Sequence, residues 1–362
     1  MTSLAQTTAI IEAFDAARRV NPRTNAIGIA EQLGISEGEL QAARIGRDVW
    51  TLPLAPSEMA ARFHTLGNVK CLTRSSLAVL EQNGTYPPLG GSQHAGLLLD
   101  PGGLDLRLMY SHWYWICLIR DPMPDKNDAP NKGAVPAARW SLQVFNQHGQ
   151  AVHKVFAKGA TAQSQTLPDS WETLRQEGAL DTPAFTQSAQ PPTRPLPEAP
   201  TLAREWAAMT DVHQFFSLLK RHQLRRLEAN TLMQGSFTQA LPVHALESLL
   251  RQASQQTLPI MLFVASQGCV QIRTGTLPTP LRVGGWLNLF GDCFTLHLDD
   301  QAVTSVWVVE KPNRDGGVTS VEAFDKRGDL VLQIYAERQE GRPERSAWRN
   351  LLTTLTRQEA VA

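Results

Sequence analysis

The chain has 362 residues, of which 42% are hydrophobic, and its 34 basic side chains are balanced by 34 acidic ones. This length predicts two to three domains, each with a core of its own. The neutral balance argues against a global electrostatic attraction to nucleic acid or to an anionic membrane. The longest apolar run, around 113–119, is too short for a membrane span, and Glu12 and Asp15 interrupt the first apolar stretch, unlike a secretory signal. We therefore expect a soluble, cytoplasmic protein that is not an integral membrane protein.

In chain order, helical spacing of apolar residues predicts a helix over 4–19 and two short helices over 27–46 that meet at Gly34. From about 68 to 157 the apolar period changes to two, and turn signals such as Asn83-Gly84 separate the runs, as is typical of an antiparallel sheet. A polar loop follows at 124–138. Residues 159–200 hold few apolar side chains and end in a proline-rich run, which predicts an extended, semi-rigid linker. Helices from about 201 and strands from about 259 to 338 then repeat the pattern.

The chain contains an internal duplication. SLQVFNQHGQAVHKVFAK (141–158) lies over SVEAFDKRGDLVLQIYAE (320–337), so that Gly149 meets Gly328 and Phe156 meets Tyr335. Upstream, 106–122 lies over 296–312 without a gap. The predicted fold class is α+β, a tandem duplication in which helices precede a large antiparallel sheet in each copy. The predicted domains are a first repeat at 1–158, a linker at 159–200 and a second repeat at 201–362, with a ligand cleft between the copies.

The cysteines and most histidines follow no catalytic or zinc-binding spacing. Cys71, Cys117, Cys269 and Cys293 are scattered through strand-like apolar contexts, which predicts buried free thiols in a reducing cytosol. Two histidines, His148 and His153, flank a predicted turn and are expected at the surface.

Residues 26–44 resemble a helix-turn-helix, with Gly34 in the turn and Ser36 as an N-cap. A recognition helix needs basic or amide side chains near its start, whereas this second helix opens with Glu37 and Glu39, which DNA phosphates would repel. The alternative, a helical hairpin packed on a sheet, is favoured. We expect no nucleic acid as a partner.

One histidine has a distinctive setting. Asp211 is a predicted N-cap with Gln214 three residues on, which places His213 in the first turn of a helix. The helix N-terminus favours a neutral imidazole, the form that ligates iron. His213 shares a helix face with Phe216 and Lys220, which could hold a flat, apolar, anionic ligand. A histidine that merely caps or packs is an equally weighted alternative.

Basic and polar side chains also gather at the strand ends of the second copy, at Lys311, Gln333, Tyr335 and Arg338. Gln333 and Tyr335 are two residues apart and therefore share one strand face. Inward-facing amide and hydroxyl groups need partners from protein or ligand. Solvated residues on a sheet edge are the alternative.

Several motifs together resemble one known family. They are LGNVKCLTR (66–74), LDLRLM (104–109), SLQVFNQHGQAVHKVF (141–156), TDVHQFF (210–216), VWVVEKP (306–312) and LQIYAERQEG (332–341). The chain is similar over nearly its whole length, duplication included, to the HemS/HmuS/ChuS family of bacterial cytoplasmic hemin-degrading or hemin-transport proteins.

The resemblance implies one haem (ferric protoporphyrin IX) per chain and assigns roles to residues. His213 matches the axial ligand of the haem iron, and Arg107 matches the residue that reaches the opposite haem face from the first copy. Phe263 matches an aromatic wall of the pocket. Polar groups near the haem propionates match Arg226, Lys311, Gln333, Tyr335 and Arg338.

The chain also departs from the family pattern. Met109 stands where relatives often have Phe, which implies a looser fit to the porphyrin. Leu80 stands where some relatives have a histidine, which argues against a second haem site built on that residue.

The leading functional hypothesis is a protein that receives imported haem for trafficking and storage, with oxidative degradation and iron release as an accessory activity. The alternative is a true haem-degrading oxygenase. No flavin or nicotinamide site is visible, so electrons for ring opening would come from outside. The expected partners are a haem importer, a reductase or a downstream haem acceptor. A DNA-binding regulator and a scaffold with a structural His213 are further alternatives.

Overall fold

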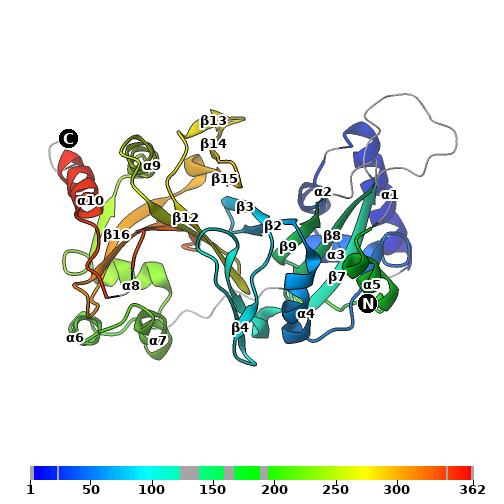
Figure 1. Ribbon diagram of the computed structural model, residues 1–362, viewed down its shortest axis with the longest axis horizontal. Helices are drawn as coiled ribbons and strands as arrows, with labels where there is room; N and C mark the ends of the chain where they lie inside the picture. The colour runs from blue at the N-terminus through cyan, green and yellow to red at the C-terminus, as the bar shows by residue number, and fades with distance from the viewer. Residues whose placement is uncertain are drawn as a thin grey trace. The chain divides into compact units, whose positions relative to one another are not determined.

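The computed structural model describes residues 4–22, 24–122, 138–158, 167–187, 195–339 and 341–359. The chain divides into two compact units, each built from discontinuous segments (Figure 1). Unit 1 comprises 1–73, 82–190 and 266–270, and unit 2 comprises 74–81, 191–265 and 271–362. The polar loop expected at 124–138 lies outside the described residues except for its last residue.

Unit 1 is a helix-flanked antiparallel sheet. Its helices are α1 (Leu4–Val20), α2 (Ala26–Leu33), α3 (Glu37–Ala43), α4 (Pro56–Arg62), η1 (Phe63–Leu66), η2 (Tyr110–His112) and α5 (Asp169–Glu177). Five strands follow the order β1 (Val49–Thr51), β7 (Trp115–Pro122), β8 (Ala138–Phe145), β9 (Ala151–Ala157) and β2 (Val69–Arg74). A second run pairs β4 (Leu89–Gly91) with β5 (Ala95–Leu98) and β5 with β6 (Asp105–Met109).

Unit 2 repeats this plan. Its helices are α6 (Ala199–Ala207), α7 (Gln214–Arg221), α8 (Arg226–Leu232), α9 (Ala245–Gln255), η3 (Asp300–Ala302) and α10 (Ser346–Glu359). Its strand order is β10 (Thr238–Leu241), β16 (Ser305–Lys311), β17 (Val318–Phe324), β18 (Leu330–Ala336) and β11 (Ile260–Ala265). A second run pairs β13 (Leu281–Val283) with β14 (Trp286–Phe290) and β14 with β15 (Phe294–Leu298). Two further strands, β3 (Ala78–Gly84) and β12 (Cys269–Gly275), begin in the residues of one unit and end in those of the other.

The predicted duplication is confirmed in detail. The β8–β9 hairpin shifts register between Val144 and Phe145, and the β17–β18 hairpin shifts at the corresponding place, between Ala323 and Phe324. Both hairpins turn through a glycine with positive φ, 70° at Gly149 and 73° at Gly328. Glycine tolerates this left-handed conformation without steric strain, which explains why it occupies the turn of both copies.

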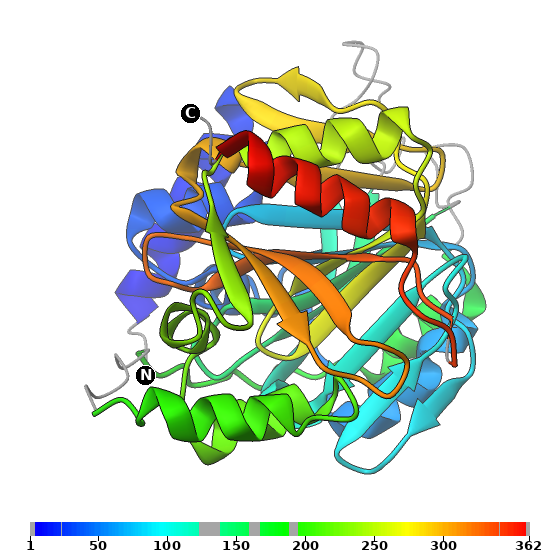
Figure 2. The same ribbon diagram turned by 90° about the vertical axis from the view of Figure 1, so that its left-hand side faces the viewer.

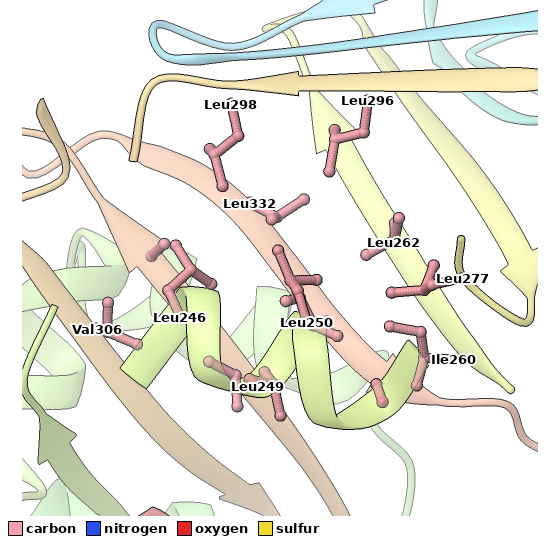
Figure 3. Packing of buried hydrophobic residues seen from close by; sticks show 14 of the residues in the cluster. Leu246, Leu249, Leu250, Ile260, Leu262, Leu277, Leu296, Leu298, Val306 and Leu332 are labelled. Carbon is pink, nitrogen blue, oxygen red and sulfur yellow. The ribbon is translucent and has the colours of Figure 1, made fainter. Parts of the chain in front are cut away.

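The sheet of unit 2 has helices on both faces. Successive strand residues point to opposite sides of the sheet, so each face contributes its own apolar residues to the contact with its helices. On one side Leu246, Leu249 and Leu250 of α9 pack against strand residues such as Leu262 and Leu332 (Figure 3). Figure 2 shows α10, in red, beside α9 on this face. On the other side α6, α7 and α8 form a separate apolar cluster with strand residues of the opposite parity. That second face carries the polar residues described below.

Part of the region predicted as a linker is folded. Helix α5 lies within 159–200, and its Trp171 is fully buried, with the indole Nε1 donating a hydrogen bond to the Leu66 carbonyl oxygen at 3.0 Å. An amphipathic helix with one large anchor needs few apolar residues, which is why composition alone indicates an extended chain here. Residues 159–166 and 188–194 lie outside the described residues.

Candidate functional site

A buried polar cluster lies on the α6–α8 face of the unit 2 sheet, centred on the Glu322 carboxylate. One carboxylate oxygen, Oε1, accepts hydrogen bonds from Lys311 Nζ at 2.8 Å, Arg226 Nη1 at 2.9 Å and Gln333 Nε2 at 3.0 Å. The other oxygen accepts one from Asn230 Nδ2 at 3.2 Å. Gln333 lies directly opposite Glu322 across the β17–β18 pair, so the register of the hairpin brings the two together. We call these five residues, with Ser320 and Tyr335, the Glu322 cluster.

The Glu322 cluster carries a net positive charge in a buried setting. Glu322 and Lys311 are 0% and 2% exposed. Burial by itself would raise the pKa of the Glu322 carboxyl, but the charges of Arg226 and Lys311 hold that pKa well below its usual range. Two cations therefore face one carboxylate. The uncompensated positive charge favours an anionic ligand, because an unbalanced buried charge is costly.

Aromatic rings frame this charge. Lys311 Nζ and the Arg226 guanidinium carbon each lie 5.0 Å from the centroid of the Phe215 ring, within cation–π range. Tyr335 packs edge-on against Phe263 with centroids 5.1 Å apart. The predicted site residues Arg226, Lys311, Gln333, Tyr335 and Phe263 therefore lie on one side of one sheet.

The position of Tyr335 and Gln333 corrects one expectation. They are not solvated edge residues, because β18 runs between β17 and β11 and Gln333 is buried. The Tyr335 hydroxyl accepts hydrogen bonds from Gln333 Nε2 at 3.3 Å and Lys311 Nζ at 3.4 Å. The partners that these polar groups require are thus supplied by the protein. Arg338, beyond the end of β18, is half-buried, and its charge acts on Glu344.

His213 is the N-cap residue of α7, and its side chain is 92% exposed. Its Nδ1 lies 2.7 Å from Asp211 Oδ1, the same oxygen that accepts the His213 backbone N–H at 2.8 Å. These two hydrogen bonds, backbone first, hold the pKa of the Asp211 carboxyl below its ordinary value. The ring thus donates from Nδ1 and presents Nε2 outward, which is the arrangement of a metal-ligating imidazole.

The residues around His213 partly match the predicted helix start. Gln214 Oε1 accepts from the Asp211 backbone N–H at 3.2 Å, as in a capping box, but the Asp211 carboxylate caps His213. The exposed side chain of Phe216, 71% accessible, and that of Lys220 lie on the same helix.

Arg107 and Met109 lie two residues apart on β6 in unit 1, so their side chains share one strand face. Arg107 Nη1 donates to Asp105 Oδ1 and, at 3.2 Å, to the Leu106 carbonyl oxygen. Burial raises the pKa of the Asp105 carboxyl, while Arg107 opposes the shift. The Arg107 side chain remains 35% exposed.

Leu80, the residue in place of a family histidine, is fully buried in the apolar core of unit 2. An imidazole there would need polar partners that this core does not supply. The departure from the family pattern is consistent with the local packing.

Two expectations about titratable residues are wrong. His153 is buried, with Nδ1 2.9 Å from Thr73 Oγ1 and Nε2 2.7 Å from the Tyr86 hydroxyl. It lies inside β9, where the apolar residues around it form the core of unit 1. Cys293 is exposed, whereas Cys71, Cys117 and Cys269 are buried free thiols as predicted. Cys293 lies in the turn before β15 rather than within a strand.

The helical hairpin at 26–44 is confirmed as a packed element. Gly34 adopts φ 68°, and Ser36 caps α3 in a capping box with Glu39. Most of α3 is buried, and Arg44, which follows it, is fully buried and bonded to Asp48 at 2.9 Å and Asp121 at 2.8 Å. A helix buried in this way cannot enter a DNA groove.

Unit 1 carries different side chains at the positions that correspond to the Glu322 cluster. Helices α3 and α8 begin at Glu37 and Arg226. Each is followed by an isolated parallel β-bridge between residues four apart, Ile45 with Val49 and Gln234 with Thr238, so the two helices correspond. Lys154 corresponds to Gln333 and pairs with Glu37 in a buried ion pair. The eight-residue helix before α3 has Asn25 as its N-cap, where α7 has His213. The first repeat therefore lacks both the imidazole and the excess positive charge.

Sequence reasoning did not predict Glu322, Phe215, Asn230 or the contact of Asp211 with the His213 ring. The run SVEAF carried a signal for Glu322, because it places a carboxylate at an inward strand position beside Ser320. Among the described residues, no three His, Cys, Asp or Glu side chains form a group that could hold a bare metal ion. Within those residues, every helix is also too short or too polar to cross a lipid bilayer.

The chain matches a known family over most of its length. Residues 34–177 and 223–355 fit the family model of the haemin-degrading HemS.ChuX domain, and the chain belongs to this family. It is 35% identical over 350 residues to the hemin transport protein HmuS of Yersinia pestis, across 96% of this chain and 97% of that protein. The hemin transport protein HemS of Yersinia enterocolitica is also 35% identical, over 357 residues, across 98% of this chain and 99% of that protein.

Solved structures of proteins named for heme degradation or heme binding superpose on nearly the whole chain. The heme degrading enzyme ChuS of Escherichia coli O157:H7 superposes with a TM-score of 0.85 and 34% identity, covering 96% of this chain and 99% of that one. Holo-PhuS, a heme-binding protein from Pseudomonas aeruginosa, superposes with a TM-score of 0.83 and 33% identity over the same shares.

Proposed function

We propose that this chain is a cytoplasmic haem-binding protein that receives imported haem for trafficking and storage, with oxidative opening of the ring as an accessory activity. The observation that carries the proposal is His213, whose Nδ1 is committed to Asp211 while the ring is 92% exposed. A solvent-exposed imidazole held in one tautomer fits an axial ligand of haem iron better than a structural cap.

The Glu322 cluster fits the remainder of a haem molecule. Haem is a flat apolar ring with two carboxylates, and this cluster offers excess positive charge beside Phe215 and Tyr335. Arg226 is the part of the cluster that a propionate can reach, because its side chain is 23% exposed while that of Lys311 is 2% exposed. We therefore assign Arg226 to direct propionate binding and Lys311 to holding the local charge.

We propose one haem per chain. The first repeat has Asn25 in place of the axial histidine and a closed Glu37–Lys154 ion pair in place of the cationic cluster. Arg107 is kept as the residue that approaches the second haem face, on the strength of the family resemblance. A haem importer, a reductase or a downstream haem acceptor is its proposed partner.

The first test is an anaerobic hemin titration of the wild-type chain and of His213→Ala. We expect a saturable Soret band with one-to-one stoichiometry, and a changed spectrum in the variant because the axial ligand is lost. His112→Ala, which removes an exposed histidine of unit 1, is the matched control and should leave the spectrum unchanged. If His213→Ala titrates with the wild-type spectrum, the ligand assignment is wrong.

The second test separates a carrier from an enzyme. Air and a reductant are added to the haem-loaded protein in the presence of catalase. A Soret band that persists supports the carrier, whereas bleaching to a tetrapyrrole product under these conditions supports the oxygenase alternative. Bleaching that catalase abolishes indicates attack by free peroxide. Arg107→Ala should retain binding and alter the spectrum or the bleaching rate.

A further inference from the structure

The Asp211 carboxylate makes two hydrogen bonds to His213, one to its backbone and one to its ring. Asp211 Oδ1 accepts both the backbone N–H and the ring Nδ1 of His213, at 2.8 and 2.7 Å. A carboxylate needed for capping alone would require the backbone contact and not the ring contact. The second contact fixes which ring nitrogen carries the proton.

The surrounding loop keeps the carboxylate in place. Gln214 Oε1 accepts from the backbone N–H groups of Thr210 and Asp211, at 2.8 and 3.2 Å. The Thr210 carbonyl oxygen in turn accepts from the Arg314 backbone N–H at 3.0 Å, which ties the loop to the β16–β17 turn. Phe215 anchors the following helix, with its ring 4.6 Å from that of Trp206. Asp211 is therefore held by contacts on both sides of the histidine.

A carboxylate at this position has a definite electronic effect on the ring. With the proton on Nδ1 and shared with a negative charge, the lone pair at Nε2 becomes more basic. A more basic axial nitrogen stabilises the more positive oxidation state of the iron. Ferric haem carries one more positive charge than ferrous haem, so its binding gains more from the electron-rich ligand.

We propose that Asp211 is a positioning residue that fixes the tautomer of His213 and makes the site selective for ferric over ferrous haem. This inference rests on the proposed role of His213 as the axial ligand. Reduction of the iron is then expected to weaken retention of the haem.

The test is Asp211→Asn in the full-length chain. The asparagine oxygen can still accept the His213 backbone N–H, so a purely structural cap is preserved while the negative charge is removed. We expect the ratio of ferrous to ferric dissociation constants to fall by roughly tenfold, in line with other second-shell partners of metal-binding histidines. For a one-electron couple this corresponds to a rise in reduction potential of about 59 mV. The iron–histidine stretching frequency of the ferrous form should also decrease.

Glu205→Gln is the matched control, because Glu205 Oε2 lies 3.2 Å from Nε2 of a different histidine of unit 2, His222. It should leave the potential and the stretching frequency at wild-type values. If Asp211→Asn does the same while His213→Ala changes the spectrum, the inference about Asp211 is wrong and the proposed function stands. If His213→Ala also leaves the spectrum unchanged, both fall together.

Discussion

Acid should destabilise unit 1 through His153, and the size of the effect follows from its burial. Burial lowers the pKa of this imidazole from 6.5 to about 3, opposed by a hydrogen bond with the backbone of Leu72. Between pH 6.5 and about 3, the unfolded chain therefore binds a proton at His153, whereas the folded chain keeps this ring neutral. Stability from the neutral ring is present above pH 6.5 and is lost as the pH falls toward about 3.

The expected loss is about 1.4 kcal/mol for each pH unit below the unfolded pKa, or about 2 kcal/mol between neutral pH and about pH 5. The assay is urea unfolding of the apo-protein across this range, comparing wild type with His153→Gln. Other titrating groups are common to both proteins, so the difference in unfolding free energy should change with pH at that slope. His112→Gln, which replaces an exposed histidine, is the control for the substitution itself.

A pH-independent difference between wild type and His153→Gln would refute this reasoning. The variant removes two buried hydrogen-bonding partners, of Thr73 and Tyr86, and its folding can therefore be compromised at every pH. A measurement on the wild-type protein alone avoids any folding defect of the variant. The ring resonances of His153 in the wild-type protein should not titrate above about pH 4, and a midpoint near the value of a free histidine would also refute it.

Two further perturbations test the site and the packing of the repeat. Arg226→Gln should weaken ferric haem binding roughly tenfold, because a charge-assisted contact to a propionate is lost while the amide can still donate to Glu322. Binding of the dimethyl ester of haem, which lacks the carboxylate charges, should change little, and an equal loss for both ligands would contradict the assignment. Gly38→Ala should destabilise the protein by about 1–3 kcal/mol in thermal or urea unfolding, because the new Cβ would lie 2.7 Å from Gly149 Cα. Gly90→Ala, whose Cβ would meet nothing closer than 3.6 Å, is the control and should remain within about 0.5 kcal/mol of wild type.

The elements with a strong local signal could be predicted from the sequence. The capping box of α3, the glycine turns at Gly149 and Gly328 and the alternation of the strands all depend on neighbouring residues, and the structure has them as expected. The duplication was visible because both copies keep these turn and core residues. The same kind of local signal indicates that His213 and Asp211 lie near a helix start.

The burial of single polar residues could not be predicted in the same way. His153 alternates with apolar residues on a strand, and only the long-range contacts with Thr73 and Tyr86 show that it faces the core. Gln333 and Tyr335 likewise could be an edge pair until the neighbouring strands on both sides are known. Glu322 was overlooked because its partners come from α8, β16 and β18, which are far apart in the sequence.

The short segment 266–270 belongs to unit 1 although more than seventy residues of unit 2 precede it in the chain. Gly268 accepts hydrogen bonds from the Trp113 indole and the Met109 backbone, both at 3.0 Å, and Ser266 Oγ donates to the Val152 carbonyl oxygen at 2.8 Å. A fragment that ends at residue 190 would therefore leave the Trp113 indole and the Met109 backbone N–H without their partners in the protein. Although the chain arose as two copies, each unit takes in a segment that lies within the other's stretch of sequence, so a single cut of the chain does not separate them.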